Sequence, residues 1–311
     1  ALGRALQGID VIFHQAGRVG VGQSMYQIER YVDVNTRGTA LLLDLLANEQ
    51  ALRERVRKLV VASSMSIYGE GAYRCLEHGR VYPQLRPADQ LAAREWEMRC
   101  PGCGERVEPL ATGEDKPLYP TSIYAISKQD QEGMCLAIGR AYGIPTVALR
   151  YFNVYGTRQA LSNPYTGVAA IFSGRLLNGQ PPVIFEDGRQ SRDFVHVSDV
   201  VQANLLAMTQ DEMDYGVFNV GTGQALTILD VAQALSRHLD SSRPPQIAHK
   251  FRAGDIRHCF PDIGRLQALG YEPGVQFADG VAELVEWVRS QTALDGFEQA
   301  RQELVRRGLA V

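Results

Sequence analysis

Tyr124 and Lys128 are the two side chains of this 311-residue chain whose types and spacing most directly suggest chemistry. They are four residues apart in a segment expected to be helical, so both should project from one helix face. A tyrosine with an ordinary pKa of about 10 is a poor base at neutral pH, but a nearby lysine cation favours the phenolate and lowers that pKa. The pair could therefore remove a proton from a hydroxyl group, although the same spacing also arises by chance in many helices.

Polar side chains also follow two apolar runs that are expected to be buried strands. His14, Ala16 and Gly17 come at or after the end of one run, and Ser63 and Ser64 end the other. Ligands of open parallel sheets bind beyond the carboxyl ends of the strands. Ser64 could hydrogen-bond a hydroxyl that is being oxidised, but a serine-rich loop that satisfies its own backbone is the commoner arrangement.

The elements that must position these groups alternate between strand and helix. Strands are expected at about 8–14, 58–64 and 146–151, and helices at about 41–46 and 122–142, with Asn35 near the start of the first helix. This alternation predicts an α/β fold with a doubly wound parallel sheet. Residues 1–150 should form that domain, and residues 151–311 a smaller mixed α/β domain partly interleaved with it.

Two local patterns are predicted in the second domain. Thr227 and Asp230 should cap the start of a helix, and residues 278–309 should form two amphipathic helices.

Composition excludes several classes of partner. The net charge is −3, and the isoelectric point of about 6.1 is mildly acidic. Nucleic-acid and membrane-surface binding need clustered positive charge, so neither is expected. The five cysteines are an odd number with irregular spacing, which favours reduced thiols in a cytoplasmic protein over a disulfide framework.

A polar segment from residue 71 to about 117 interrupts the alternating pattern and is interpreted as an insertion. Cys75 and His78 form one pair of potential metal ligands, and Cys100 and Cys103 form a second pair after an interval of 21 residues, positions 79 to 99. Two such pairs on tight turns could close a tetrahedral structural zinc site in a segment with little core of its own. The alternative is a set of ordinary reduced thiols with a solvated histidine.

Several motifs together resemble those of the extended short-chain dehydrogenases/reductases, and within them the NAD-dependent sugar-nucleotide epimerases. They are His14–Gly17, Asn35–Thr39, Val60–Gly69, Tyr124–Lys128, Tyr151–Gly156, Gly188–Asp199, Phe218–Gly223 and Arg252–Asp255. The resemblance covers the chain apart from the insertion, and it implies a Rossmann-like NAD-binding domain followed by a substrate domain. Gln15 and Thr157 depart from the usual family pattern.

The resemblance also implies roles for individual residues. It makes Tyr124 the catalytic base, Lys128 its pKa-lowering partner and Ser64 the hydroxyl that orients the sugar. It implies that NAD contacts His14, Ala16, Gly17, Asn35, Ser63, Tyr124, Lys128 and Tyr151. A nucleotide-diphosphate sugar is expected to contact Ser64, Ser66, Asn153, Arg192, Arg252 and Asp255. Arginine suits the last role because it binds phosphate through two hydrogen bonds.

The loop after the strand that ends at Ser64 limits which reactions of the family are expected. Related dehydratases and decarboxylases carry an acidic residue there, whereas Met65, Ser66 and Ile67 offer no carboxylate. This favours epimerisation at C4 through a transient 4-keto sugar. The stretch from Pro164 to Val168 and the cysteine-bearing insertion are most similar to enzymes that act on dTDP-L-rhamnose, with UDP-glucose as the alternative.

The start of the chain leaves a second class of function open. The first residue is Ala, and the chain begins at what resembles the helix before the family's fourth strand, so we expect roughly 50 to 65 further residues to carry the glycine-rich pyrophosphate turn. Without them the chain should bind NAD weakly or not at all, and an inactive NAD-free binding or scaffold protein is the alternative. The family resemblance further implies a homodimer.

Overall fold

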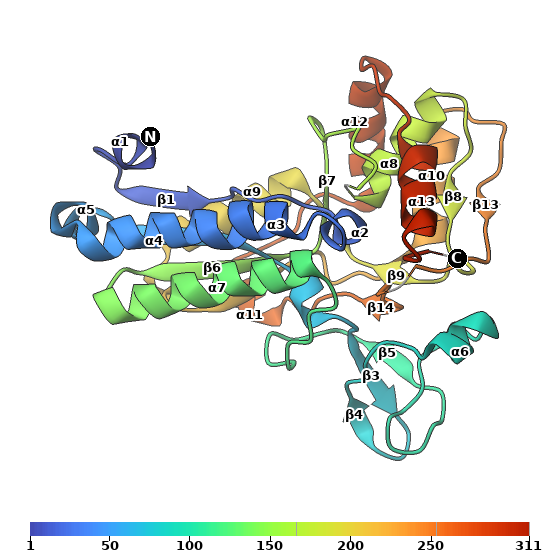
Figure 1. The fold of residues 1–311 in the computed structure, drawn as a ribbon, viewed down its shortest axis with the longest axis horizontal. Helices are drawn as coiled ribbons and strands as arrows, with labels where there is room; N and C mark the ends of the chain where they lie inside the picture. Colours follow the sequence, from blue (N-terminus) through green and yellow to red (C-terminus); the bar gives the residue numbers. More distant parts are fainter. Residues whose placement is uncertain (166, 253, 311) are drawn as a thin grey trace.

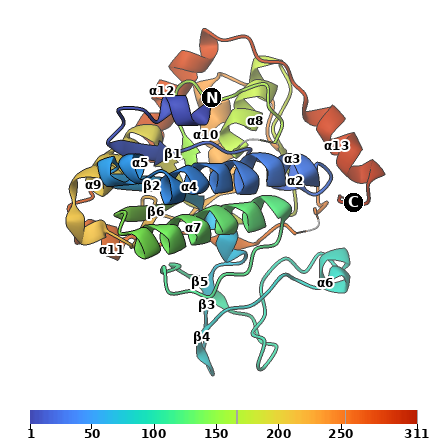
Figure 2. The same ribbon diagram turned by 60° about the vertical axis from the view of Figure 1, so that its left-hand side comes forward.

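The structure, a computed structural model, describes residues 1–165, 167–252 and 254–310. Figures 1 and 2 show a central sheet between helices, a second group of helices beside it and a smaller segment that projects from the rest of the molecule. Thr166 and Ala253, which fall within two of the family-like stretches, and Val311 lie outside the described residues.

The central sheet has four strands in the order β1-β2-β6-β11. They are β1 (Val11–His14), β2 (Lys58–Ser64), β6 (Thr146–Tyr151) and β11 (Val217–Val220). All three neighbouring pairs are parallel. The predicted parallel α/β fold is therefore confirmed, and β1 is an edge strand among the described residues.

Strand β2 is buried along its whole length because helices cover both faces of the sheet. Leu59 and Val61 point into the layer formed with helices α4 (Gly38–Asn48) and α7 (Ile123–Tyr142). Val60 points to the opposite layer. This two-sided burial explains the continuous apolar run in the sequence.

On the opposite layer, helix α9 (Val197–Thr209) packs Val200, Ala203 and Ala207 against the sheet. This helix and β11 both come after residue 151, so the interleaving of the two halves takes the form of a return of the chain to the first sheet. Helix α11 (Gly264–Gln267) also packs on β11 through Leu266.

Helix α7 begins and ends where local chemistry directs. The Ser122 side chain accepts a hydrogen bond from the backbone N–H of Ala125 at 3.1 Å, which caps the first turn. The helix stops at Gly143, whose φ of 68° is left-handed and favours glycine.

The expectation that Asn35 lies near the start of a helix is wrong. The helical run begins earlier, at α3 (Ile28–Tyr31), and continues through a π-helical turn, η1 (Val32–Arg37), into α4. Asn35 lies inside that turn and is fully buried. The wider π-helical turn is the kind of irregularity that often occurs at functional sites.

The second half of the chain packs helices around its own core. These helices are α8 (Val168–Leu177), α10 (Ile228–His238) and α12 (Phe277–Arg289), and they are followed along the chain by α13 (Phe297–Arg306). Both predicted tail helices are thus present, and Thr227 and Asp230 form the predicted capping box at the start of α10.

The insertion forms an antiparallel sheet of order β4-β3-β5 and a short helix, which project from the body in both views. Its elements are β3 (Ala72–Cys75), β4 (Gly79–Val81), α6 (Ala88–Ala92) and β5 (Glu108–Leu110).

The remaining elements are short. They are α1 (Leu2–Ala5), α2 (Val21–Ser24), α5 (Gln50–Arg55), η2 (Met65–Tyr68), β7 (Asn153–Tyr155), β8 (Val183–Ile184), β9 (Ser191–Arg192), β10 (Phe194–His196), η3 (Asp211–Met213), β12 (Leu226–Thr227), β13 (Gln246–Ile247) and β14 (His258–Cys259). Among the described residues, no helix combines the length and apolar character needed to cross a membrane.

Candidate active site

The carboxyl ends of three neighbouring strands bring the predicted residues to one edge of the sheet. His14 ends β1, Ser64 ends β2 and Tyr151 ends β6. Helix α7, which carries Tyr124 and Lys128, packs along β2 and β6. The fold therefore gathers at one edge the groups that the sequence places far apart.

Tyr124 sits in the first turn of α7 in surroundings that hold its ring. Its backbone N–H donates to Ser24 Oγ at 3.0 Å, and its ring meets the ring of Tyr31 edge-on with centroids 6.4 Å apart. Burial raises the pKa of Tyr124 above its ordinary value, and a hydrogen bond with the Ser64 side chain acts in the opposite direction. The sequence predicts that Lys128 lowers this pKa, but in the structure the group that favours the phenolate is Ser64.

Lys128 is buried one turn further along α7. Its ammonium donates to Gln131 Oε1 at 2.8 Å, and burial lowers its pKa to about 8. A Cβ at Gly17 would lie 3.4 Å from Asn35 Oδ1 and 3.8 Å from Lys128 Nζ. The backbone at Gly17 thus runs past both polar groups, and an ammonium with three donors keeps capacity for a ligand beside it.

His14 belongs to a polar network behind this edge. Its Nε2 lies 2.7 Å from Thr39 Oγ1 and 3.1 Å from Gln131 Nε2, and Gln131 also donates to the Ala16 carbonyl. Burial, with a smaller contribution from the nearby Lys128 charge, lowers the pKa of His14 from 6.5 to about 4. The imidazole is therefore neutral at pH 7.

This shift predicts a pH-dependent component of stability. Because the pKa of His14 is about 4 in the folded chain and 6.5 without burial, the unfolded chain binds the extra proton between those values. His14 should thus lower the unfolding free energy by about 2 kcal/mol on going from pH 7.5 to pH 5. His14→Gln should remove this component in urea titrations. Parallel pH profiles for the two proteins would contradict the assignment.

Asn35 links three segments of the site. Its Nδ2 donates to the Arg18 carbonyl and to Ser127 Oγ, and its Oδ1 accepts from the Arg18 N–H at 2.7 Å. The side chain therefore holds the loop after β1 against α7, and any contact it makes with a ligand would add to this positioning role.

Ser63, which the family resemblance assigns to the cofactor, uses its hydroxyl within the protein. The hydroxyl donates to Glu132 Oε2 at 2.6 Å. Glu132 in turn forms a two-point ion pair with Arg150, with Nη2 to Oε1 at 2.6 Å and Nε to Oε2 at 3.0 Å. This buried network ties α7 to β2 and β6.

Ser64 and Ser66 stay close together at the end of β2. The Ser66 hydroxyl donates to Ser64 Oγ at 2.9 Å, and the Ser66 N–H points to the same oxygen at 3.2 Å. The next acidic residue, Glu70, accepts from the N–H groups of Arg257 and His258 and from the Tyr73 hydroxyl. Its carboxylate is thus engaged by other parts of the chain.

The four predicted substrate residues of the second half are already engaged with protein groups. Asn153 Nδ2 donates to the Asp193 carbonyl. Arg192 donates to the carbonyls of Ser191, Ile256 and Arg257, and Arg252 Nε donates to Asp255 Oδ2 at 2.8 Å. The two arginines therefore fix the loop around residue 256, and a phosphate would have to share or replace these bonds.

Ser24, Gln131, Glu132 and Asp193 are among the residues around the site that were not assigned a role from the sequence. Gln131 and Glu132 follow Lys128 within one turn, which is the signal that could have drawn attention to them. Asp193 accepts from Thr222 N–H, Thr222 Oγ1 and Gln224 N–H, while burial raises its pKa to about 6.

The departure at Gln15 has a visible structural counterpart. Its Nε2 donates to the Tyr151 hydroxyl and to Asn204 Oδ1, each at 3.0 Å. Tyr151, predicted as a cofactor contact, is thereby oriented by Gln15 and Asn204, and its pKa is raised by burial.

Taken together, these residues place a hydrogen-bonded phenol, a serine hydroxyl and a buried ammonium along one open edge of a parallel sheet. The phenol and the serine can exchange a proton with a hydroxyl held between them. The ammonium can bind an oxygen-rich ligand and favour a negative charge nearby.

Comparison with known proteins identifies a family. The family model of the NAD dependent epimerase/dehydratase family matches residues 1–87 and 102–221. A dTDP-L-rhamnose 4-epimerase of Burkholderia thailandensis is 33% identical over 91% of this chain and 76% of its own length.

Solved structures show the same likeness. The UDP-glucose 4-epimerase of Thermotoga maritima with UDP-glucose has a TM-score of 0.72 and 30% identity, and the match covers 92% of this chain and 79% of that one. The UDP-glucose 4-epimerase of Thermus thermophilus with NAD has a TM-score of 0.70 and 30% identity, with 92% and 80% covered.

Proposed function

The chain belongs to the NAD-dependent epimerase/dehydratase family, and from this premise we propose that it inverts C4 of a nucleotide-diphosphate sugar. The observation that carries this proposal is the proximity of Tyr124 and Ser64 at the carboxyl end of β2, where the Ser64 side chain acts to lower the pKa of Tyr124. A sugar hydroxyl that enters between them would contact both groups.

The residues around Gly17 fit an NAD cofactor. The buried Lys128 ammonium and the Asn35 side chain border the backbone of Gly17, where the absence of a Cβ leaves room for close approach. Lys128 would hold ribose hydroxyls, and Tyr151 would lie at the neighbouring strand end. When bound, NAD supplies a reversible hydride acceptor for C4 of the sugar.

The chain's own residues would move the proton and orient the sugar. Tyr124 Oη would take the proton of the C4 hydroxyl, while Ser64 Oγ hydrogen-bonds the same oxygen. In this geometry the Ser64 side chain is the group that favours the phenolate, while Lys128 would hold the ribose of the cofactor. After the keto sugar has turned over in the site, Tyr124 would return the proton to the same oxygen, O4, and so restore the hydroxyl.

The absence of a carboxylate from Met65, Ser66 and Ile67 favours epimerisation over dehydration or decarboxylation. Glu70, the next acidic residue, is held by backbone N–H groups of residues 257 and 258. We propose dTDP-L-rhamnose as the sugar nucleotide, with support from the Burkholderia relative. UDP-glucose is the second candidate, because solved UDP-glucose epimerases resemble the chain at nearly the same identity.

We also propose that the protein is a homodimer, on the basis of family resemblance. We propose a cytoplasmic location because its five cysteines form no disulfide in the structure.

The proposed reaction predicts internal return of hydrogen. Protein that holds NAD should be incubated in D₂O with dTDP-L-rhamnose, UDP-glucose and UDP-galactose in parallel and followed by NMR. We expect inversion at C4 of dTDP-L-rhamnose without deuterium at C4, because the hydride that leaves the sugar is the one that returns. Conversion of a UDP-sugar alone would reassign the substrate, and no conversion by NAD-loaded protein would favour a binding or scaffold protein.

A further inference from the structure

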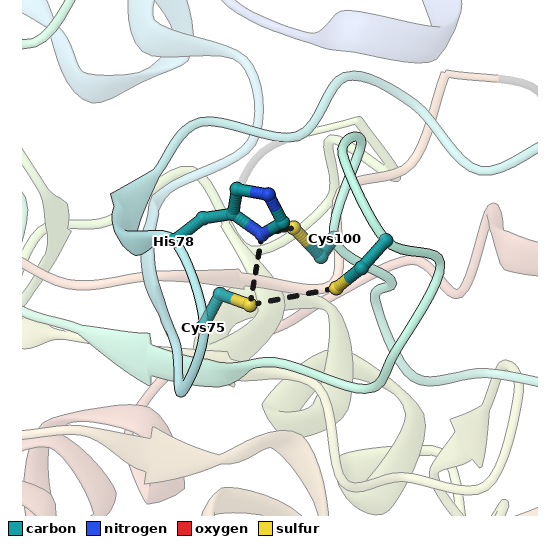
Figure 3. Close-up of side chains that lie close together, drawn as sticks. Cys75, His78 and Cys100 are labelled. Atoms are coloured by element: carbon teal, nitrogen blue, oxygen red, sulfur yellow. Dashed lines mark hydrogen bonds between the residues drawn. The ribbon is translucent and has the colours of Figure 1, made fainter.

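Four potential metal ligands meet in the projecting insertion, outside the site described above. Cys75 ends β3, His78 lies in the turn to β4, and Cys100 and Cys103 lie in a second turn before β5. Their ligand atoms all lie within 4.8 Å of one another. Figure 3 shows the imidazole of His78 turned toward the sulfurs of Cys75 and Cys100.

The spacing of these atoms fits a tetrahedral metal ion. His78 Nδ1 lies 3.6 Å from both Cys75 Sγ and Cys100 Sγ, and Cys75 Sγ lies 3.6 Å from Cys103 Sγ. With zinc–sulfur bonds of about 2.3 Å and zinc–nitrogen bonds of about 2.0 Å, a tetrahedron separates sulfur from nitrogen by about 3.5 Å and two sulfurs by about 3.8 Å. A disulfide would need the two sulfurs at about 2.0 Å.

The backbone is shaped to bring the ligands together. Gly79 and Gly104, which follow the two ligand pairs, have φ values of 68° and 76°, a left-handed conformation that favours glycine. A Cβ at Gly102 would lie 3.0 Å from His78 Nε2, so only glycine lets the imidazole approach freely. The Gly102 N–H also donates to Cys100 Sγ, 3.4 Å away, which holds the second turn around this sulfur.

The apolar core of the insertion itself is small. Its buried apolar cluster consists of Tyr73, Cys75, Met98, Cys100 and Val107, so two of the five members are themselves candidate ligands. A small cluster of this kind gives a projecting segment little stability, whereas a bound metal contributes its binding free energy to folding.

We propose that Cys75, His78, Cys100 and Cys103 bind one zinc ion as a closed structural site. Three thiolates and one imidazole match the donor set of structural zinc, and four protein ligands leave no position for a reacting water. This site is independent of the NAD and sugar-nucleotide chemistry proposed above.

The site also has a consequence for the body of the protein. Glu97, close to Cys100 in sequence, forms an ion pair with Arg257 at 2.5 Å, and its other carboxylate oxygen lies 3.2 Å from His258 Nε2. Arg86 pairs with Glu186 at 2.7 Å with both side chains almost fully buried. A metal-folded insertion thus presents these two charges to the substrate half of the chain at fixed positions.

Metal analysis of protein purified without added metal tests the proposal. We expect about one zinc per chain by elemental analysis, and its loss in Cys100→Ser. Cys135→Ser is the matched control, since Cys135 is equally buried but lies in α7 outside the insertion, and it should keep the metal. Metal that survives in Cys100→Ser, or iron in place of zinc, would overturn the assignment.

A second measurement on the unaltered protein guards against a variant that simply fails to fold. Stripping the metal with a chelator should expose residues 71–117 to protease while the rest of the chain stays intact, and zinc sulfate should restore protection. If protein that contains no metal already resists cleavage in this segment, the proposal is wrong.

Discussion

Replacement of Tyr124 by phenylalanine should reduce kcat by about 100-fold or more, which is the usual contribution of a positioned general base. The substitution removes only the hydroxyl that hydrogen-bonds Ser64 and leaves the ring against Tyr31. KM for the sugar nucleotide should therefore change little. The measurement is steady-state turnover of a preparation shown to hold NAD.

Tyr142→Phe is the matched control for this variant. Tyr142 ends the same helix, is 43% exposed and stacks with Arg53, so it lies on α7 but away from the strand ends. It should keep normal turnover. Near-normal kcat in Tyr124→Phe would mean that another group takes the proton, and the proposed active site would have to be abandoned.

Replacement of Glu132 by glutamine should lower the unfolding free energy by about 3 to 5 kcal/mol, because it leaves Arg150 buried without its charge partner. The two side chains are 6% and 5% exposed and share two hydrogen bonds. Removal of one member of such a pair costs more than the pair itself contributes. Urea unfolding at pH 7 measures the change.

The same chemical change at Glu108 is the control. Glu108 pairs with Arg74 at 2.6 Å, but the two side chains are 67% and 58% exposed, so solvent screens the interaction. Glu108→Gln should shift the unfolding free energy by about 0.5 kcal/mol at most. Equal losses in the two variants would show that burial does not strengthen the Glu132 ion pair.

The elements that can be predicted from the sequence are strands covered on both faces and helices with a local cap. The bounds predicted for β2 and β6 match the structure, since both strands are apolar runs covered on two faces. The start of helix α10 can also be predicted, because its capping box is a local interaction between Thr227 and Asp230. Capping interactions and burial on two faces can both be predicted from the types and order of nearby residues.

The hydrogen-bond partners of the site residues cannot be predicted in this way. The π-helical turn that holds Asn35 is not visible in the hydrophobic pattern, because it adds one residue to a turn inside a continuous helical run. Whether Ser63 or Ser64 faces the open edge depends on the alternation of β2 and on Glu132, which comes from a distant segment. The engagement of Arg192 by three backbone carbonyls is likewise decided by tertiary packing.

The network of Ser63, Glu132 and Arg150 holds the site in place, whereas Tyr124 and Ser64 are the groups proposed to react. Glu132 lies one turn beyond Lys128 on α7, and Ser63 directly precedes Ser64 on β2, so this clamp sets the distance between helix and strand. Tyr124 and Ser64 take no part in this network, so a ligand that meets their side chains would leave the clamp unchanged. The protein can thus exchange ligands at Tyr124 and Ser64 while residues that never contact the ligand keep helix α7 aligned with strand β2.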